Sequence, residues 1–352
     1  MRILIIGAGA IGTMLGVRLT LSGKEVTYHD RPEVIAALAK DGLSMVVDGK
    51  THRVSQVRTD GDLSGGLRRV PYDLAILCVK AYHTEEAVKK LDRSLFTSLL
   101  TIQNGVGNEE FLISRFGADQ LFSGAITLPV GRNPAGVPEI ANARGGIGVA
   151  PVRKGDSCEE VLTLFKRADF VTRIYGDYRA LKWSKLLINM LGNAASALLA
   201  VPPQEIFYDR RLTGIEKEAF LEALEVMKKM KIAPVDLPSY PVRLIALLFS
   251  LASPTMLEVI VNSQKSMSRG SKMPSLYLDL ESGSGSSEVE VLNGAVAREG
   301  ERLGVRVPVN KFLYRTLDAM AKGRIPRDRF RGKREEFLEA LLEAREGKGD
   351  AP

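Results

Sequence analysis

Three glycines near the start of the chain form the pattern Gly-x-Gly-x-x-Gly, at Gly7, Gly9 and Gly12. Residues 2–6, which are apolar from Ile3 on, are typical of a buried strand, and residues 13–22 follow as an expected helix. In this context the first glycine permits a tight turn, the second admits a pyrophosphate, and the third lets helix and strand pack closely. A plain strand-to-helix turn is the structural alternative. We predict that the loop binds a dinucleotide cofactor through Gly7, Ala8, Gly9, Ala10, Ile11 and Gly12.

Strands and helices continue to alternate after the loop. Strands are expected at residues 25–30, 73–79 and 99–103, helices at residues 31–40 and 84–91, and β-structure at residues 43–58 with a hairpin turn at Asp48-Gly49. Strands with helices between them predict a parallel, doubly wound sheet. Beyond it the chain favours helices, expected at residues 179–200, 213–231, 240–267 and 287–303, before Pro308 interrupts the pattern.

These elements predict an α/β protein, in which an N-terminal Rossmann-type doubly wound sheet is followed by an all-α C-terminal domain. We expect a dinucleotide-binding domain over residues 1–176 and a helical substrate and catalytic domain over residues 177–322. Residues 323–352 carry charges of both signs, and we expect them to form a solvated helix or a loose end rather than a nucleic-acid site.

Composition narrows the class of protein. The 352 residues are 45% hydrophobic and 26% charged, which is ordinary for a globular chain of about two domains. No apolar run approaches the ~20 residues of a membrane span, and no secretory signal or metal-ligand spacing is evident. Cys78 and Cys158 are too few for a disulfide framework, so we expect a reducing cytoplasm. The chain has a net charge of +7, but its basic residues form no stripe interleaved with aromatic residues. We therefore expect anionic small molecules and no nucleic acid as partners.

The second expected strand ends in Asp30-Arg31. An acidic residue there can bond the ribose 2′-OH of NAD, whereas an arginine can pair with the 2′-phosphate of NADP. Both are present, so local chemistry leaves the choice open. A surface charge at a helix start is the structural alternative for Arg31.

A polar stripe runs along the apolar segment after residue 180. Lys185, Asn189 and Asn193 step by four, so in a continuous helix they share one face. Asparagine is a poor helix former and is costly in a core unless it is paired. The stripe is either the solvent face or a polar pocket wall, and we favour the pocket, where a buried lysine can donate a proton.

Several motifs in order resemble the ketopantoate reductases (2-dehydropantoate 2-reductases) over roughly residues 1–320. The family shares the glycine loop and an arginine that matches Arg31. Its remaining motifs appear here as Val79-Lys80-Ala81, Gln103-Asn104-Gly105-Val106-Gly107, Lys185…Asn189…Asn193, Ser275…Asp279, Ser287-Glu288-Val289-Glu290 and Asn293-Gly294.

The resemblance implies NADPH-dependent reduction of 2-dehydropantoate to (R)-pantoate, which serves pantothenate and coenzyme A synthesis. It implies that Lys185 protonates the ketone oxygen and that Glu288 accepts a hydrogen bond from the substrate hydroxyl. It also implies that Arg31 contacts the 2′-phosphate, that Lys80 and Asn104 line the nicotinamide end and help to place the ketone, and that the substrate's polar groups bind Asn189, Asn193 and Ser275.

Other interpretations stay open. Ser287 and Glu290 fit a capping box, in which Glu288 has no catalytic role, while Lys80 and Asn104 fit an exposed charge and an ordinary loop residue. Another branched 2-oxo acid can be the substrate, and a non-catalytic dinucleotide sensor is the alternative outside enzymes. NAD(H) stays possible because of Asp30. The apolar residues 244–251 fit either a homodimer contact or the core.

Overall fold

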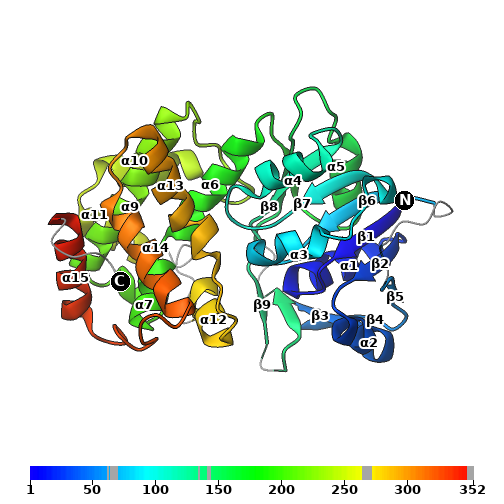
Figure 1. Cartoon of the computed structure of the whole chain (residues 1–352), viewed down its shortest axis with the longest axis horizontal. Coiled ribbons are helices and arrows are strands. Elements are labelled where there is room, and N and C mark those ends of the chain that lie inside the picture. The colour runs from blue at the N-terminus through cyan, green and yellow to red at the C-terminus, as the bar shows by residue number, and fades with distance from the viewer. Residues whose placement is uncertain (62, 64–69, 134, 141–143, 264–271, 347–352) are drawn as a thin grey trace. The chain divides into compact units, whose positions relative to one another are not determined.

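The computed structural model describes residues 1–61, 63, 70–133, 135–140, 144–263 and 272–346, and it forms two compact units (Figure 1). The first unit contains Met1–Lys182 and Asp236–Tyr240, and the second contains Trp183–Val235 and the chain from Pro241 onward.

The first unit is built on an eight-stranded sheet in the order β12-β11-β8-β7-β6-β1-β2-β5. The strands are β1 (Arg2–Ile6), β2 (Glu25–His29), β5 (Arg58–Thr59), β6 (Tyr72–Leu77), β7 (Phe96–Thr101), β8 (Leu121–Ile126), β11 (Ile147–Pro151) and β12 (Thr172–Ile174). Their pairings are parallel except that of β8 with β11. The strand order reverses direction at β1, as the doubly wound prediction requires, so that prediction is confirmed.

Both faces of this sheet are buried, which explains the uninterrupted apolar run of β1. Ile3 and Ile5 pack with Met14 of α1 on one face, and Leu4 packs with Leu112 on the other. The helices of this unit are α1 (Ala10–Leu21), α2 (Pro32–Asp41), α3 (Thr84–Val88), α4 (Asn108–Phe116) and α5 (Glu159–Arg167), with short 3₁₀ turns at Ala81–His83 and Arg93–Leu95.

A second, four-stranded sheet packs on α1 in the order β4-β3-β10-β9. Its strands are β3 (Leu43–Val47), β4 (Lys50–Val54), β9 (Val130–Arg132) and β10 (Pro138–Ile140). Asp48 and Gly49 join β3 to β4 with φ of 47° and 77°, so the expected hairpin turn is confirmed. The sequence pattern predicts no strands between residues 121 and 174, where β8, β9, β10, β11 and β12 lie. Three of them, β9, β10 and β12, have only three residues, which is too short for a clear alternation.

The second unit is helical. Its helices are α7 (Ala194–Leu199), α8 (Pro203–Ile206), α9 (Arg210–Lys229), α10 (Val242–Leu251), α11 (Pro254–Ser263), α12 (Ser275–Ser282), the 3₁₀ turn η3 (Glu288–Val291), α13 (Asn293–Leu303), α14 (Pro308–Ala321) and α15 (Arg334–Glu346). The helix α6 (Tyr178–Met190) begins in the first unit and ends in the second. The expected class, a Rossmann-type sheet followed by an all-α region, is confirmed.

Several helix boundaries differ from the sequence expectation. The helix expected at residues 179–200 ends at Met190, because Gly192 adopts a φ of +62°. Pro254 starts a new helix within residues 240–267, of which 264–267 lie outside the described residues. The helix expected from residue 287 begins as the 3₁₀ turn η3. Pro308 does not end the helical pattern but occupies the first turn of α14, where its missing N–H costs nothing.

The charged C-terminal segment is part of the second unit rather than a loose end. Phe337 of α15 is fully buried, and its ring centroid lies 5.7 Å from that of Phe312 and 5.8 Å from that of Phe330. Arg211 of α9 donates two hydrogen bonds to Glu335, at 2.8 and 2.7 Å. The expected domain limits at residues 176 and 322 stay predictions.

Candidate functional site

The glycine loop lies between β1 and α1, at the carboxyl edge of the large sheet. Gly7 has a φ of +100°, and a Cβ there would lie 2.7 Å from a Val79 side-chain atom. A Cβ on Gly12 would lie 1.9 Å from the Gly7 carbonyl oxygen, whereas a Cβ on Gly9 would meet nothing within 4 Å. The fold therefore requires Gly7 and Gly12, while the bare backbone at Gly9 leaves room for a ligand.

The start of α1 suits an anion. Gly9 is its N-cap and provides no side-chain hydrogen bond, so the first N–H groups of α1 have no side-chain cap. A helix N-terminus of this kind favours phosphate groups. Ala10 and Ile11 form the first turn and are half-buried. The loop thus fits the pyrophosphate of a dinucleotide.

Asp30 and Arg31, which follow β2, form an ion pair of 3.9 Å, and each has a further partner. Asp30 accepts a hydrogen bond from the Ala8 N–H, with 2.6 Å between Ala8 N and Oδ2, and another from the Arg31 N–H at 2.7 Å. The Arg31 side chain is 72% exposed, and its guanidinium lies 3.2 Å from the Glu33 carboxylate. Asp30 therefore stabilises the glycine loop through its backbone, and the Arg31 guanidinium lies at the same edge of the sheet.

Lys80 and Asn104 lie on the loops after β6 and β7. The strands β7, β6, β1 and β2 are parallel neighbours, so the loops after them share one edge of the sheet. The Lys80 carbonyl accepts a hydrogen bond from His83 N at 2.9 Å, and the Asn104 carbonyl accepts one from the Asn108 side chain at 3.0 Å. The structure thus gathers every expected cofactor residue at the edge where doubly wound sheets bind ligands.

In the second unit Asn189, Asn193 and Ser275 lie together. The Asn193 side-chain amide donates to the Asn189 carbonyl at 3.0 Å and to the Ser275 hydroxyl at 3.4 Å, across 82 residues of chain. Asn193 Oδ1 accepts a hydrogen bond from Leu276 N at 3.3 Å. Lys185 is half-buried on α6, one turn before Asn189. Because α6 ends at Met190, the expectation of one continuous helical stripe is wrong: Asn193 is instead the N-cap of α7.

Glu288 is buried at the start of η3. Its N–H donates to Oδ2 of Asp279 at 3.1 Å, and Asp279 is buried on α12, one turn after Ser275. The Ser287 hydroxyl accepts a hydrogen bond from Val289 N at 3.2 Å, so it caps a 3₁₀ turn and not the α-helix that the sequence suggested. The helix α12 thus presents Ser275 and the residue that anchors Glu288.

Sequence reasoning gave no role to four buried polar residues beside these positions, Gln103, Glu109, Lys182 and Asp279. The signal that could have identified Lys182 is its place between the apolar residues Leu181 and Trp183, where a solvent-exposed lysine would not be expected. Glu109 gave no such signal, because acids are common in the first turn of a helix.

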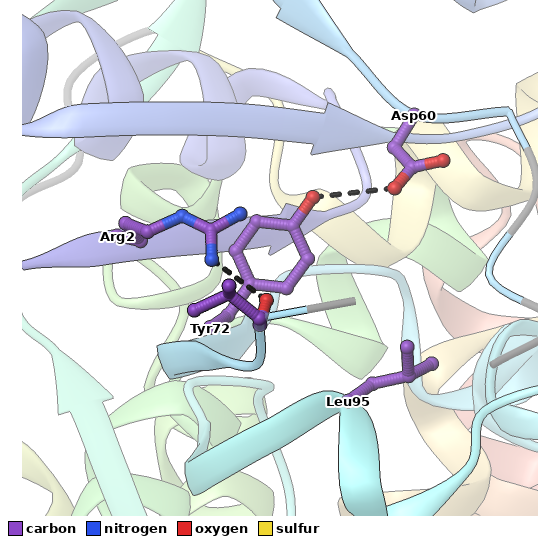
Figure 2. A pocket seen from close by; sticks show the side chains of 5 residues that line it. Arg2, Asp60, Tyr72 and Leu95 are labelled. Atoms are coloured by element: carbon purple, nitrogen blue, oxygen red, sulfur yellow. Dashed lines mark hydrogen bonds between the residues drawn. The ribbon is translucent and has the colours of Figure 1, made fainter. Parts of the chain in front are cut away.

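A hollow of about 230 Å³ lies elsewhere on the first unit (Figure 2). Its lining includes Arg2 and Tyr72, the first residues of β1 and β6, so it lies toward the amino ends of these strands. The Arg2 guanidinium is 5.2 Å from the centroid of the Tyr72 ring, and the Tyr72 hydroxyl donates to Asp60 at 3.2 Å. None of the residues that line this hollow belongs to the glycine loop, which follows the carboxyl end of β1.

Among the residues that the structure describes, no group of His, Cys, Asp or Glu side chains could hold a metal ion. No described helix is long and apolar enough to span a membrane.

Comparison with known families matches both parts of the chain. The family model described as "Ketopantoate reductase PanE/ApbA" matches residues 3–153, and the one described as "Ketopantoate reductase PanE/ApbA C terminal" matches residues 177–321. The chain is 27% identical to a 2-dehydropantoate 2-reductase of Pyrococcus horikoshii over 326 residues, which cover 91% of this chain and 97% of the relative.

Solved structures share the fold. A 2-dehydropantoate 2-reductase of Geobacter metallireducens GS-15 superposes with a TM-score of 0.75 at 25% identity, covering 91% of this chain and 100% of its own. A D-mandelate dehydrogenase in a ternary structure with NADH and anilino(oxo)acetate has a TM-score of 0.76 at 22% identity, covering 92% of this chain and 99% of its own.

Proposed function

Because the chain belongs to the ketopantoate reductase family, and is therefore an oxidoreductase acting on CH–OH groups, we propose that it reduces 2-dehydropantoate to (R)-pantoate with NADPH. The product would enter pantothenate and coenzyme A synthesis. The observation that carries the proposal is the convergence of Asn189 on α6, Asn193 at the N-cap of α7 and Ser275 on α12. Lys185 lies on α6, one turn before Asn189. A polar cluster that includes two asparagines suits a small polar acid better than an apolar ligand.

The proposed reaction needs a proton donor for the ketone oxygen and residues that hold the substrate. The nicotinamide, when bound, supplies hydride to C2 of the ketone. Lys185 then protonates the oxygen on which negative charge develops. Asn189, Asn193 and Ser275 hold the polar groups and carboxylate of the substrate, and Glu288 accepts a hydrogen bond from its hydroxyl.

For the cofactor we propose NADPH over NADH. Both oxygens of the Asp30 carboxylate already accept backbone N–H groups, whereas the Arg31 side chain is exposed and able to pair with a 2′-phosphate. Lys80 and Asn104 would contact the nicotinamide end. NADH is the alternative, since the D-mandelate dehydrogenase of similar fold is described with it.

The second unit exposes an apolar face on α10 and α11, formed by Leu244, Leu247, Leu251, Met256 and Val259. We propose that a second copy of the chain covers this face, because exposed apolar area of this kind is more often an interface than a free surface. Two other residues of α10, Ile245 and Phe249, are buried and belong to the core. Both described cysteines are free thiols, which supports a reducing compartment such as the cytoplasm.

The deciding experiment measures NADPH and NADH oxidation with a panel of 2-oxo acids. The panel contains 2-dehydropantoate, smaller branched 2-oxo acids and an aryl 2-oxo acid. We expect the highest kcat/KM for 2-dehydropantoate with NADPH. A higher kcat/KM for another acid would replace the substrate, and cofactor binding without turnover of any acid would identify a dinucleotide sensor.

A further inference from the structure

A buried ion pair lies inside the first unit, between Lys182 of α6 and Glu109 of α4. Lys182 Nζ is 3.2 Å from Glu109 Oε1, and the two side chains are 2% and 1% exposed. Ser123 donates a hydrogen bond to the same carboxylate oxygen at 2.7 Å. Burying two charges is costly and often contributes no net stability. The pair is therefore not explained by stability alone, and the proposed reaction uses neither residue.

The Lys182 ammonium has a second acceptor, the main-chain carbonyl oxygen of Gln103. That carbonyl belongs to the peptide group that joins Gln103 to Asn104, and a peptide group is planar. The ammonium therefore fixes the orientation of the peptide that leads into Asn104. Glu109 in turn holds the ammonium in place from the first turn of α4.

The Gln103 side chain joins the two loops that would meet the nicotinamide. Its amide donates to the Val79 carbonyl at 2.9 Å and to the Thr84 hydroxyl at 2.7 Å, and its oxygen accepts a hydrogen bond from Thr101 at 3.0 Å. Val79 directly precedes Lys80, as Gln103 precedes Asn104. Lys80 and Asn104 are thus held by one buried network, in which Lys182 provides the only charged donor to Gln103 that the described contacts contain.

We propose that Lys182 is a positioning residue, whose ammonium, held by Glu109, sets the Gln103 peptide so that Asn104 is correctly oriented for the hydride donor and the ketone. This inference rests on the proposed function and deepens it. It also explains the position of the pair: α6 carries Lys182 one turn before Lys185, so one helix bears both the positioning lysine and the proposed proton donor.

Two double variants separate positioning from stability. K182M/E109Q and K182Q/E109Q both remove the two buried charges, so neither leaves an unpaired ion, and both are expected to fold. Methionine and glutamine have the same chain length, but only glutamine has an N–H to offer the Gln103 carbonyl. The matched control is Glu110→Gln, which changes an exposed acid next to Glu109 that binds the Tyr178 hydroxyl instead.

We expect kcat of K182M/E109Q to fall about 10-fold or more, the scale of a lost charge-assisted hydrogen bond. The Kd for NADPH, from protein fluorescence, should stay within about threefold, because the glycine loop is untouched. K182Q/E109Q should recover part of kcat, and E110Q should keep all of it. A K182M/E109Q protein of wild-type melting temperature and wild-type kcat would overturn the proposal, as would equal kcat in the two double variants.

Hydrogen exchange provides a readout that does not depend on the substrate. The amides of residues 104–107 should exchange faster in K182M/E109Q than in K182Q/E109Q, with the amides of residues 7–12 unchanged. If the wild type reduces no 2-oxo acid but this difference appears, the proposed function fails and the positioning role stands. If the difference is absent, the positioning role fails whatever the substrate.

Discussion

Asp30 accepts a hydrogen bond from the backbone N–H of Ala8, with 2.6 Å between Ala8 N and Asp30 Oδ2. The acid that follows β2 is thus tied to the glycine loop that follows β1, through strands that pair in parallel. A residue at this position is usually considered for its contact with the ribose. Here it also shapes the loop, so changes at Asp30 and at its neighbour Arg31 should have different effects.

Arg31→Ala should weaken NADPH selectively. The lost pairing with the 2′-phosphate should raise the Kd for NADPH about 10-fold or more and leave the Kd for NADH nearly unchanged. Fluorescence titration with both cofactors measures this. Glu33→Gln is the control, because it removes the acid 3.2 Å from Arg31 and should keep or tighten NADPH binding. An equal loss for both cofactors would show that Arg31 does not read the phosphate.

Asp30→Ala should weaken both cofactors together. It leaves the Ala8 N–H without its acceptor, a change that costs about 1–3 kcal/mol when the donor is buried. Both Kd values should therefore rise by similar factors, accompanied by a lower melting temperature. A variant that binds NADPH normally and loses only NADH would instead assign Asp30 to the ribose.

Gly9→Ala and Gly12→Ala should affect different properties, the first cofactor affinity and the second stability. The new Cβ of Gly12→Ala meets the Gly7 carbonyl oxygen at 1.9 Å, so the melting temperature should fall. The new Cβ of Gly9→Ala meets no atom within 4 Å, so that variant should keep its melting temperature and lose NADPH affinity. Thermal unfolding and NADPH titration of both variants test this, and normal binding by Gly9→Ala would place the pyrophosphate elsewhere.

Lys185→Ala should remove the proton donor and leave cofactor binding unchanged. We expect kcat to fall about 10²-fold or more, the usual scale of general acid catalysis, with an unchanged Kd for NADPH. Lys229→Ala, which changes an exposed lysine at the end of α9, is the control. Near-normal turnover by Lys185→Ala would exclude it as the acid.

Glu222 should make the stability of the second unit depend on pH. Burial raises the pKa of its carboxyl from 4.5 to about 7, although the hydrogen bonds that it accepts from the N–H groups of Asn310 and Val309 lower the pKa. The pKa of Glu222 is higher in the folded state than in the unfolded state. The stability that the protonated carboxyl contributes is therefore fully present below pH 4.5 and is lost as pH rises through about 7.

The corresponding measurement is the free energy of unfolding between pH 4.5 and 8 for wild type and Glu222→Gln. The difference between the two should change by about 3 kcal/mol over that range, since one pKa unit is worth about 1.4 kcal/mol. Glu225→Gln, on the same helix but more exposed, should parallel the wild type. A pH-independent difference between wild type and Glu222→Gln would show that Glu222 does not titrate in this range.

The family and the glycine loop could be predicted because their signals are local. The glycine spacing, the apolar run of β1 and the hairpin at Asp48-Gly49 each depend on the backbone preferences of a few adjacent residues. The resemblance to ketopantoate reductases, carried by such short motifs in order, is confirmed by family models over residues 3–153 and 177–321. The individual site roles stay predictions.

Other features were decided only by tertiary contacts. The break after Met190 is stabilised from α9, where Glu216 accepts a hydrogen bond from Gly192 N at 2.8 Å, and Asn193 meets Ser275 from 82 residues away. The partner of Lys182 could not be read from its neighbours either, because its acceptor at Gln103 lies 79 positions earlier. The sequence alone determined the fold class and the loop that suits a dinucleotide, since local φ and apolar spacing dictate them. Only the folded chain decided which polar groups are buried together, because a buried charge finds its partner through packing, not through sequence proximity.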